Sequence, residues 1–461
     1  MNGHPRSSPP GAETSPPGLA LRPTRVRWRI MVLLLMIAGL TYVDRLNLSI
    51  AGKFIQDEYH IGTQTMGWIL SAFVLGYALF QVPAGWVADR FGPRGTITWA
   101  VLWWSGFTAA TAIAPRLPLV GWVGLAGSFV IVRFLVGVGE AAAYPSSSKM
   151  VAFWMGAGHR GTGSSLVFTG IGIGGALTPT LIAWVMQHYG WRLSFYLCAT
   201  LGIIAAAVWR FYATDHPEDH PHVNAAELAV IRAGLTPPVR DAQPTDPGQR
   251  PTWGRLFSSS TVWALIVSYF CIAYAAYIYY TWFYIYLVRV RGLTIMQGGL
   301  WGSTPFVAIM LLAPLGGWTS DRLVARIGKR RGRQTAVWLG VACSATMLWA
   351  GAHAVNNTLA ILLLAGASGF NLFATASWWA ACIDLTRNYS GSLSGLMNMC
   401  GNLGGWLAAI GTAFIATRLG WTQALDFAAL LTLIAGVLWI MVNAEHNLEV
   451  SMPKPNNPQR G

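Results

Sequence analysis

Two pairs of opposite charges stand inside apolar stretches of this chain. Asp44 and Arg45 are neighbours near the end of an apolar run that begins at Trp28, and Arg133 and Glu140 lie in another run. A spacing of seven residues places Arg133 and Glu140 on one face of a helix. A charged side chain in hydrocarbon costs about 2.5–3.5 kcal/mol even on lenient insertion scales, so such groups usually face a water-filled cavity. The four charges sum to zero. Such a group of charges in a cavity could bind an ion and help to move it across the membrane.

Protonation of Asp44 or Glu140 would leave a positive charge unbalanced in a low-dielectric cavity, where it would attract an anion. A carboxylate in such a cavity takes up a proton more readily than one in water. The residues therefore predict a proton-coupled carrier of organic anions. Two alternatives are an Asp-Arg pair that only ends a helix at the lipid headgroups and a buried ion-pair network that only fixes packing. Buried pairs contribute little to stability, which favours the functional interpretation.

The elements that must position these charges are membrane helices. Of the 461 residues, 54% are hydrophobic and 10% are charged, whereas soluble domains carry about 25% charged residues. Apolar runs of about 20 residues, long enough to span a bilayer, predict twelve helices: Trp28–Ile50, Thr65–Ala88, Gly95–Ala114, Val120–Ala143, Gly161–Gln187, Trp191–Tyr212, Val262–Val288, Met296–Ser320, Gln334–His353, Thr358–Ile383, Ser390–Thr417 and Thr422–Val442. The runs do not alternate as the strands of an outer-membrane barrel do. The predicted fold is an all-α integral membrane protein.

A single long polar interruption divides these helices six and six. The expected organisation is a disordered cytoplasmic tail (1–27), an N-terminal six-helix half (28–212), a cytoplasmic linker (213–260) with a short helix near 224–234, a C-terminal six-helix half (261–443) and a second cytoplasmic tail (444–461). Most Lys and Arg residues fall in connections on the linker's side of the membrane, which by the positive-inside rule predicts cytoplasmic termini and a multi-pass protein of the cell (inner) membrane. The net charge of +14 is assigned to these loops, not to nucleic-acid binding.

One motif occurs at equivalent places in the two halves. Gly-x-x-x-Asp-Arg follows the second predicted helix, from Gly85, and the eighth, from Gly317. Parallel repeats of this kind characterise one large transporter architecture. We expect each Asp to pair with a nearby Arg or to accept hydrogen bonds from a helix N-terminus of the other half, holding one conformation closed. The residues predicted to form this gate are Gly85, Asp89, Arg90, Arg94, Asp321 and Arg322.

Other kinds of chemistry lack their motifs. The sequence has no Gly-x-x-x-x-Gly-Lys-Ser/Thr loop for ATP, no His-Glu-x-x-His and no Gly-x-Ser-x-Gly. Its five cysteines lack metal-site spacing and are expected to act as small hydrophobes. We therefore expect no enzyme activity, cofactor or metal. The expected partners are a small organic anion, protons and the lipid bilayer, and the protein is expected to be monomeric.

The motifs from Gly85 to Arg94 and at Gly317 resemble the major facilitator superfamily. The stretch Tyr42-x-Asp44-Arg45-x-Asn47, together with Arg133 and Glu140, resembles its anion:cation symporter family. This resemblance implies alternating access, with proton coupling at Asp44 and Glu140, the substrate carboxylate on Arg45, and Arg133 as a partner of the acid. By the same resemblance the substrate pocket includes Tyr42, Tyr77, Tyr277, Trp379 and Asn398.

The substrate is less sharply indicated. The resemblance favours a sugar acid of the hexonate, hexuronate or glucarate kind, and an aromatic or dicarboxylic acid is the alternative. Gly170 stands where hexonate carriers place a polar sugar contact, and Ile272 where glutamate carriers place Arg. Tyr284 replaces a usual Pro in the run from Tyr277 to Leu287. Most other tyrosines of this run are expected to be interfacial anchors. An exporter of the same fold is disfavoured because Thr178-Pro179 replaces the Gly-Pro pair typical of antiporters.

Overall fold

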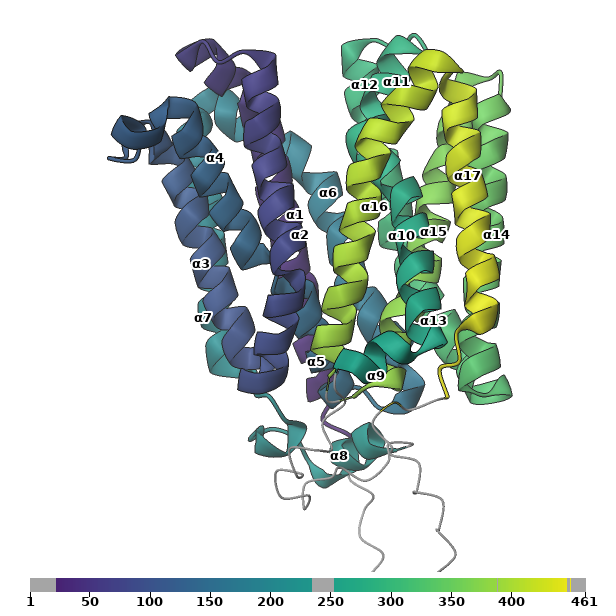
Figure 1. Ribbon diagram of the computed structural model, residues 1–461. Helices are drawn as coiled ribbons and strands as arrows, with labels where there is room; N and C mark the ends of the chain where they lie inside the picture. Colours follow the sequence, from purple (N-terminus) through teal and green to yellow (C-terminus); the bar gives the residue numbers. More distant parts are fainter. Residues whose placement is uncertain (1–21, 234–252, 388, 446–447, 449–461) are drawn as a thin grey trace, which may run out of the picture.

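The structure, a computed structural model, describes residues 22–233, 253–387, 389–445 and 448. Every regular element in these ranges is a helix. The helices form two groups that stand side by side, with the linker at one end (Figure 1). We call this end the linker side and the opposite end the far side.

The N-terminal group contains seven helices. They are α1 (Val26–Tyr59), α2 (Thr63–Phe91), α3 (Pro93–Ile113), α4 (Val120–Glu140), α5 (Ala143–Trp154), α6 (Arg160–Tyr189) and α7 (Trp191–Tyr212). α1 starts two residues before the predicted helix and extends beyond the predicted end at Ile50. The chain starts on the linker side and returns there after α7.

The C-terminal group repeats this arrangement. It contains α10 (Ser260–Thr281), α11 (Phe283–Arg289), α12 (Ile295–Gly302), α13 (Thr304–Ile327), α14 (Lys329–His353), α15 (Asn357–Leu385), α16 (Ser390–Arg418) and α17 (Trp421–Leu438). Across the two groups, α6 packs along α13 and α2 packs along α16. These two helix pairs form the main contact between the halves, and α15 also contacts α6 while α16 contacts α5.

Proline residues lie near two breaks between consecutive helices. A proline cannot donate the backbone hydrogen bond that continues a helix. Pro145 lies in the first turn of α5, just after α4 ends at Glu140, and Pro305 lies in the first turn of α13, just after α12 ends near Ser303. The fourth predicted helix was expected to end at Ala143, but the chain continues as α5 for another turn and more, to Trp154.

The described part of the linker belongs with the N-terminal group. Helix α8 (Ala225–Arg232) forms where a short helix was expected, and α9 (Trp253–Ser258) precedes α10. The Asn224 side chain caps α8 by accepting from the backbone N–H of Glu227. The buried carboxylate of Glu227 in turn accepts from the backbone N–H groups of Val26 and Arg27 at 2.9 and 3.0 Å. The linker thus caps the first turn of α1.

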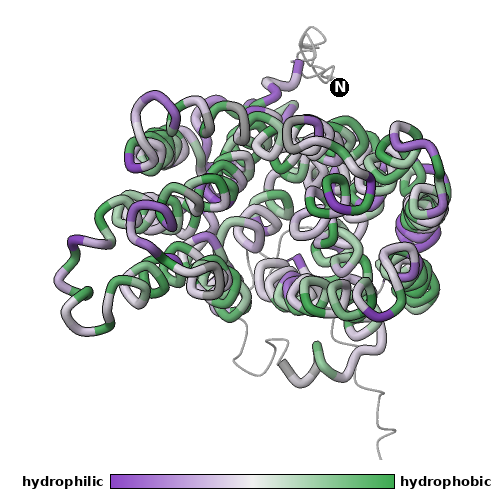
Figure 2. The backbone as a smooth tube through the Cα atoms, turned by 90° about the horizontal axis from the view of Figure 1, so that it is seen from above, coloured by the Kyte–Doolittle hydropathy of each residue, from purple (hydrophilic) through white to green (hydrophobic). Residues whose placement is uncertain are grey.

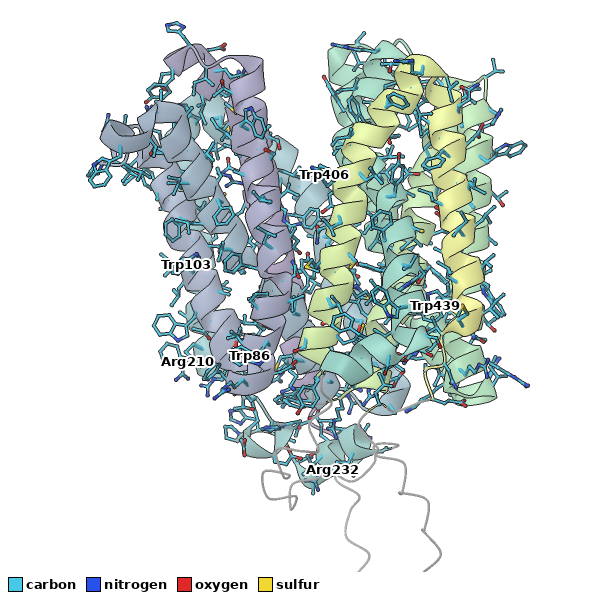
Figure 3. The ribbon with its side chains drawn as sticks, in the orientation of Figure 1. Trp86, Trp103, Arg210, Arg232, Trp406 and Trp439 are labelled. Carbon is cyan, nitrogen blue, oxygen red and sulfur yellow. The ribbon has the colours of Figure 1, made fainter. Side chains whose placement is uncertain are left out.

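The outside of the bundle is apolar, as a lipid-facing surface should be. Hydrophobic stretches surround the bundle when it is viewed along the helices, and exposed side chains such as Trp86 and Trp103 project from it (Figures 2 and 3). Within the described residues, eleven helical segments are long and apolar enough to cross a membrane. A further long helix, α6, has 30 residues. Nearly all of its residues from 160 to 176 are buried, against α1 and α13.

Candidate functional site

A pocket lies between the two halves at mid-depth. The space that it leaves for the centres of water-sized molecules is about 80 Å³. Helices α1, α2, α5 and α6 supply one wall, and α10, α15 and α16 supply the other. The lining residues are Tyr42, Arg45, Tyr77, Tyr144, Phe168, Ile171, Tyr269, Ile272, Ala273, Ala276, Tyr277, Tyr280, Asn371, Leu372, Thr375, Trp379, Asn398, Gly401 and Asn402.

Arg45 presents the positive charge of this pocket. Its Nε donates to Glu140 Oε2 at 2.9 Å, which ties α1 to the end of α4. The guanidinium carbon lies 4.3 Å from the ring centroid of Tyr77 and 5.2 Å from those of Tyr42 and Phe73. Such cation–π contacts stabilise a cation where water is scarce. Arg45 Nη2 is buried and has no hydrogen-bond partner in the protein.

Asp44, Arg133 and Glu140 lie behind this wall and do not line the pocket. All three are almost fully buried, at 3%, 2% and 0% exposure. Asp44 Oδ1, Glu140 Oε1 and two guanidinium nitrogens of Arg133 have no hydrogen-bond partner in the protein. Asp44 interacts electrostatically with Glu140, Arg133 and Arg45, although no ion pair within 4 Å joins it to them in the described chain.

The four charged residues predicted from the sequence therefore do not all contact one another. Arg45 and Glu140 form a direct ion pair, whereas Arg133 faces the ring of Phe73 at 5.2 Å. Asn47, one turn beyond Asp44 on α1, fixes α1 to α7 because it accepts from Ser194 Oγ at 2.8 Å and donates to Cys198 Sγ at 3.4 Å. This bond anchors the segment that carries both Asp44 and Arg45.

The predicted pocket residues Tyr42, Tyr77, Tyr277, Trp379 and Asn398 all line the pocket. Sequence reasoning did not find the other aromatic walls, which come from Tyr144, Phe168, Tyr269 and Tyr280. Tyr144 was missed because it follows the expected end of the fourth helix. No spacing pattern distinguished Phe168 and Tyr269 from ordinary packing residues.

Two expectations about individual residues were wrong. Gly170 does not contact the pocket, because it lies against the backbone of α1, where an added Cβ would be 2.2 Å from the Leu35 carbonyl oxygen. The α6 wall of the pocket is instead Phe168 and Ile171. Most tyrosines of the seventh predicted helix are not interfacial anchors either. Tyr274, Tyr279 and Tyr286 are buried within the C-terminal half, and Tyr284 is the exposed one.

A carboxylate closes the seam between α2 and α16 on the linker side. Asp89 accepts from the backbone N–H groups of Gly391 and Ser392 at 3.1 and 2.7 Å and from Ser392 Oγ at 2.6 Å. These donors form the N-terminus of α16, where a negative charge is favourable. Lys149 Nζ lies 3.1 Å from the same carboxylate. Gly85 permits this approach, because an added Cβ would be 2.3 Å from the Gly391 carbonyl oxygen.

The seam between α6 and α13 repeats this arrangement. Asp321 accepts from the backbone N–H groups of Gly161 and Thr162 at 2.9 and 2.6 Å, at the N-terminus of α6. Arg333 donates to Asp321 at 2.9 Å and to Asp384 at 3.2 Å. A Cβ on Gly317 would lie 2.3 Å from the Gly161 carbonyl oxygen. Both motif aspartates therefore bind a helix N-terminus of the opposite half.

The arginines of the repeated motif do not join these seams. Arg90 stacks near Trp86 and Arg322 near Trp318, and Arg94 donates to the Arg210 carbonyl oxygen at 2.6 Å. The cations that meet the motif aspartates are instead Lys149 and Arg333. Both helix N-termini that bind a motif aspartate contain a Gly followed by Ser or Thr. This pattern at the start of α6 and of α16 could have identified them from the sequence.

The contacts between the halves indicate which end of the molecule is closed. The hydrogen bonds, ion pairs and ring contacts that join the halves, among the described residues, lie on the linker side or at the level of the pocket. The outermost of them are the ring contacts of Tyr42 with Tyr280 and Phe306. The two helix groups diverge toward the far side (Figure 1).

Two six-helix halves that enclose a central cationic pocket define a multi-pass membrane carrier for anions. Residues 34–409 match the Major Facilitator Superfamily, and the chain belongs to it. It is therefore a transporter and not an enzyme, and its relatives are anion carriers, as the resemblance to the anion:cation symporter family predicted.

Three relatives illustrate the range of that group. The chain is 30% identical over 427 residues to the probable galactarate/D-glucarate transporter GudP of Escherichia coli, which covers 91% of this chain and 94% of GudP. It is 30% identical over 417 residues to the chloroplastic ascorbate transporter of Arabidopsis thaliana, covering 90% and 74%. It is 28% identical over 399 residues to the probable sulfoacetate transporter SauU of Cupriavidus necator, covering 86% and 89%.

Solved structures share the fold at low identity. The proton:xylose symporter XylE superposes with a TM-score of 0.70 at 14% identity, covering 91% of this chain and 96% of XylE. The transporter FucP in its outward conformation gives a TM-score of 0.67, also at 14% identity, covering 91% and 100%. These matches confirm the predicted twelve-helix fold in two halves.

Proposed function

We propose that this protein is a proton-coupled symporter that imports a small organic anion by alternating access. The observation that carries the proposal is the pair Arg45–Glu140. A guanidinium on the pocket wall has one edge bound to a buried acid and leaves Nη2 without a partner. A substrate carboxylate can occupy that free edge with a charge-assisted hydrogen bond.

Charge balance supplies the coupling. Asp44, Arg45, Arg133 and Glu140 sum to zero, so a bound monoanion would leave a net negative charge in a buried site. Uncompensated charge is costly there. A proton on Glu140 neutralises its carboxylate, which weakens the ion pair with Arg45. The net charge of the site with the bound monoanion then returns to zero. Anion and proton therefore favour each other's binding by the same factor, as linkage requires.

The two seams supply the gate. Asp89 and Asp321 hold the linker side closed, Gly85 and Gly317 allow the close approach, and Lys149 and Arg333 supply the cations. We infer that substrate and protons enter from the far side and that the seams part to release them on the linker side. Each acid is held by hydrogen bonds and ion pairs and by no covalent bond, so both seams can part and form again.

Orientation follows from charge. Basic residues such as Arg326, Lys329, Arg330 and Arg331 gather at the linker-side ends of α13 and α14. We propose that this side is cytoplasmic, with both termini there and the protein in the cell membrane. The halves 28–212 and 261–443 would then move about the central pocket as units, and a monomer contains a complete pathway.

Two substrate classes remain candidates. The names of relatives such as GudP favour a sugar acid, which is the first interpretation from the sequence. An aromatic or dicarboxylic acid is the second. Either class places its carboxylate on Arg45.

The test is proton movement driven by the anion. D-gluconate and mandelate, one probe from each class, are added in turn to proteoliposomes in weakly buffered medium. The proposal expects external alkalinisation with at least one probe, none in protein-free liposomes, and none with Arg45→Ala. Anion uptake without proton movement would contradict proton coupling.

A further inference from the structure

We infer that the pocket takes an aromatic monocarboxylate, an acid with a single negative charge and a flat apolar body of about the size of benzoate. This inference rests on the proposed function, because it places the carboxylate on Arg45. It chooses between the two substrate classes from the chemistry of the walls.

The charge of the lining sets the charge of the ligand. Arg45 is the one charged side chain among the lining residues that the structure describes. Asp44, Arg133 and Glu140 lie behind the wall and together carry one net negative charge, which Arg45 balances. A second carboxylate would therefore enter a buried pocket without a cation to meet it, which disfavours a dicarboxylic acid.

Aromatic side chains are the largest group in the lining. Eight of the nineteen lining residues are aromatic, namely Tyr42, Tyr77, Tyr144, Phe168, Tyr269, Tyr277, Tyr280 and Trp379. Phe168 lies 5.4 Å from Trp379 in an edge-to-face contact and stacks on Tyr144 at 6.1 Å. Flat rings pack well against such walls in offset or edge-to-face arrangements.

These rings form a floor and a roof. Trp379 and Phe168 lie toward the linker-side ends of α15 and α6, and Tyr144 is at the start of α5, so they form the floor. Tyr280, near the far-side end of α10, contacts Tyr42 at 6.0 Å and forms the roof. Arg45 stands on the wall beside them, so a planar acid can present its carboxylate sideways and its ring faces up and down.

Several hydrogen-bond donors of the pocket are already engaged within the protein. All three lining asparagines donate their amide N–H to protein acceptors: Asn371 to the Ile272 carbonyl, Asn398 to Tyr77 and Gln81, and Asn402 to the Asn398 carbonyl. The Trp379 N–H donates to Tyr269 Oη, and the Thr375 hydroxyl donates to the Asn371 carbonyl.

A polyhydroxylated acid would find few free donors among these amide, indole and threonine groups, because they already donate within the protein. Buried hydroxyls without partners are costly. A benzoate-like acid has no such groups to satisfy. The same walls therefore discriminate against a sugar acid and in favour of an aromatic one.

The test is a binding series on the purified full-length protein, measured by ligand-induced thermal stabilisation. The probes are benzoate, cyclohexanecarboxylate, terephthalate and D-gluconate. They vary planarity, charge and hydroxylation around one carboxylate. We expect benzoate to bind at least about ten-fold more tightly than D-gluconate, because a site rejects ligands whose polar groups it leaves unpaired. Cyclohexanecarboxylate should fall between them, and terephthalate should bind more weakly than benzoate.

Two variants locate the site. Trp379→Leu removes part of the floor and should weaken benzoate binding about ten-fold, a typical loss for an aromatic contact plus its buried area. Trp406→Leu is the matched control, because Trp406 lies on α16 (labelled in Figure 3), is 58% exposed and is not among the residues that line the pocket. It should leave benzoate binding unchanged. Arg45→Ala should abolish it.

The outcomes distinguish the aromatic-ligand assignment from the proposed carboxylate site on Arg45. Tighter Arg45-dependent binding of D-gluconate than of benzoate would overturn the aromatic assignment and leave an organic-anion symporter. Benzoate binding that survives Arg45→Ala, or is equal in Trp379→Leu and Trp406→Leu, would also overturn the assignment to this pocket. Failure of all four acids to stabilise the folded wild type would overturn the proposed carboxylate site as well.

Discussion

Arg45 and Glu140 join α1 to α4 through an ion pair of 2.9 Å, with the arginine on the pocket wall and the acid fully buried behind it. Arg45 therefore borders the space that a substrate would fill. Glu140 does not border it and would be affected by the substrate only through Arg45. This relationship allows a proton on Glu140 to control how strongly Arg45 attracts an anion.

Replacement of Arg45 tests the carboxylate site. Arg45→Lys keeps a positive charge but loses the planar fork that can hold Glu140 with one edge and a carboxylate with another. We expect anion binding to weaken by about 2–5 kcal/mol, roughly 30-fold or more, the usual loss when one partner of a buried charged pair is removed. Isothermal titration with benzoate and D-gluconate measures this loss. Unchanged affinity in Arg45→Lys would place the carboxylate elsewhere.

Gly85 tests the linker-side seam. Gly85→Ala would put a methyl group 2.3 Å from the Gly391 carbonyl oxygen, so α2 and α16 must separate. Gly95→Ala is the matched control, because its Cβ would meet nothing within 4 Å. Both changes carry the same gain in helix propensity of about 1 kcal/mol.

Distances between spin labels report the result. After replacement of the five native cysteines, one label pair is placed at Phe91 and Ile327 on the linker side and another at Trp122 and Val355 on the far side, all exposed positions. Gly85→Ala should lengthen the linker-side distance and shorten the far-side one, while Gly95→Ala leaves both unchanged. Identical distributions in the two variants would show that the Gly85 contact does not hold the closed end.

Glu58 supplies a control for pH dependence. It lies beyond the membrane-spanning part of α1, and Arg192 holds the pKa of its carboxyl at about 2, below the usual 4.5. The folded state thus gains stability from this charge above pH 4.5 and loses it as the pH falls toward 2. An exposed pair contributes below about 1 kcal/mol. Because Glu58 stays charged between pH 5 and 8, Glu58→Gln should keep the wild-type pH profile of uptake. A profile shifted in Glu58→Gln would assign part of the pH dependence to the far-side end of α1.

The membrane potential tests the number of protons. Two buried acids, Asp44 and Glu140, predict two protons for each monoanion and hence one net positive charge moved inward. An inside-negative potential then adds about 2.3 kcal/mol per 100 mV to the driving force. Initial uptake of labelled D-gluconate or mandelate into proteoliposomes should rise when the potential is imposed without a pH gradient. Uptake that responds to acidification alone would reduce the count to one proton.

Local sequence patterns were sufficient for the helices, the four charges and the two motif aspartates. Asp89 and Asp321 were expected either to pair with a nearby Arg or to accept from a helix N-terminus of the other half. Each accepts from two backbone N–H groups of such a terminus. The prediction for the two aspartates succeeded because the repeated motif marks equivalent positions in the two halves. The prediction for the four charges succeeded because a charged side chain inside an apolar run has few stable environments.

Contacts that depend on packing between distant helices were not predictable from one sequence. Lys149 and Tyr144 lie on α5, whose existence depends on how the chain resumes a helix near Pro145. The position of Gly170 was misjudged because the resemblance fixed its place along α6 but not its direction, and the close approach of α1 turned that face away from the pocket. Arg333 was expected to be a loop anchor, yet it is buried between Asp321 and Asp384.

The central claim, that Glu140 couples the proton to the anion, is tested most directly by Glu140→Gln in proteoliposomes. Two assays are compared with labelled D-gluconate and mandelate: exchange of internal for external anion, and net accumulation under an imposed pH gradient. The neutral amide keeps the shape of a protonated Glu140, so we expect exchange to continue while accumulation disappears. Accumulation equal to that of the wild type would contradict the account and remove Glu140 from the coupling step.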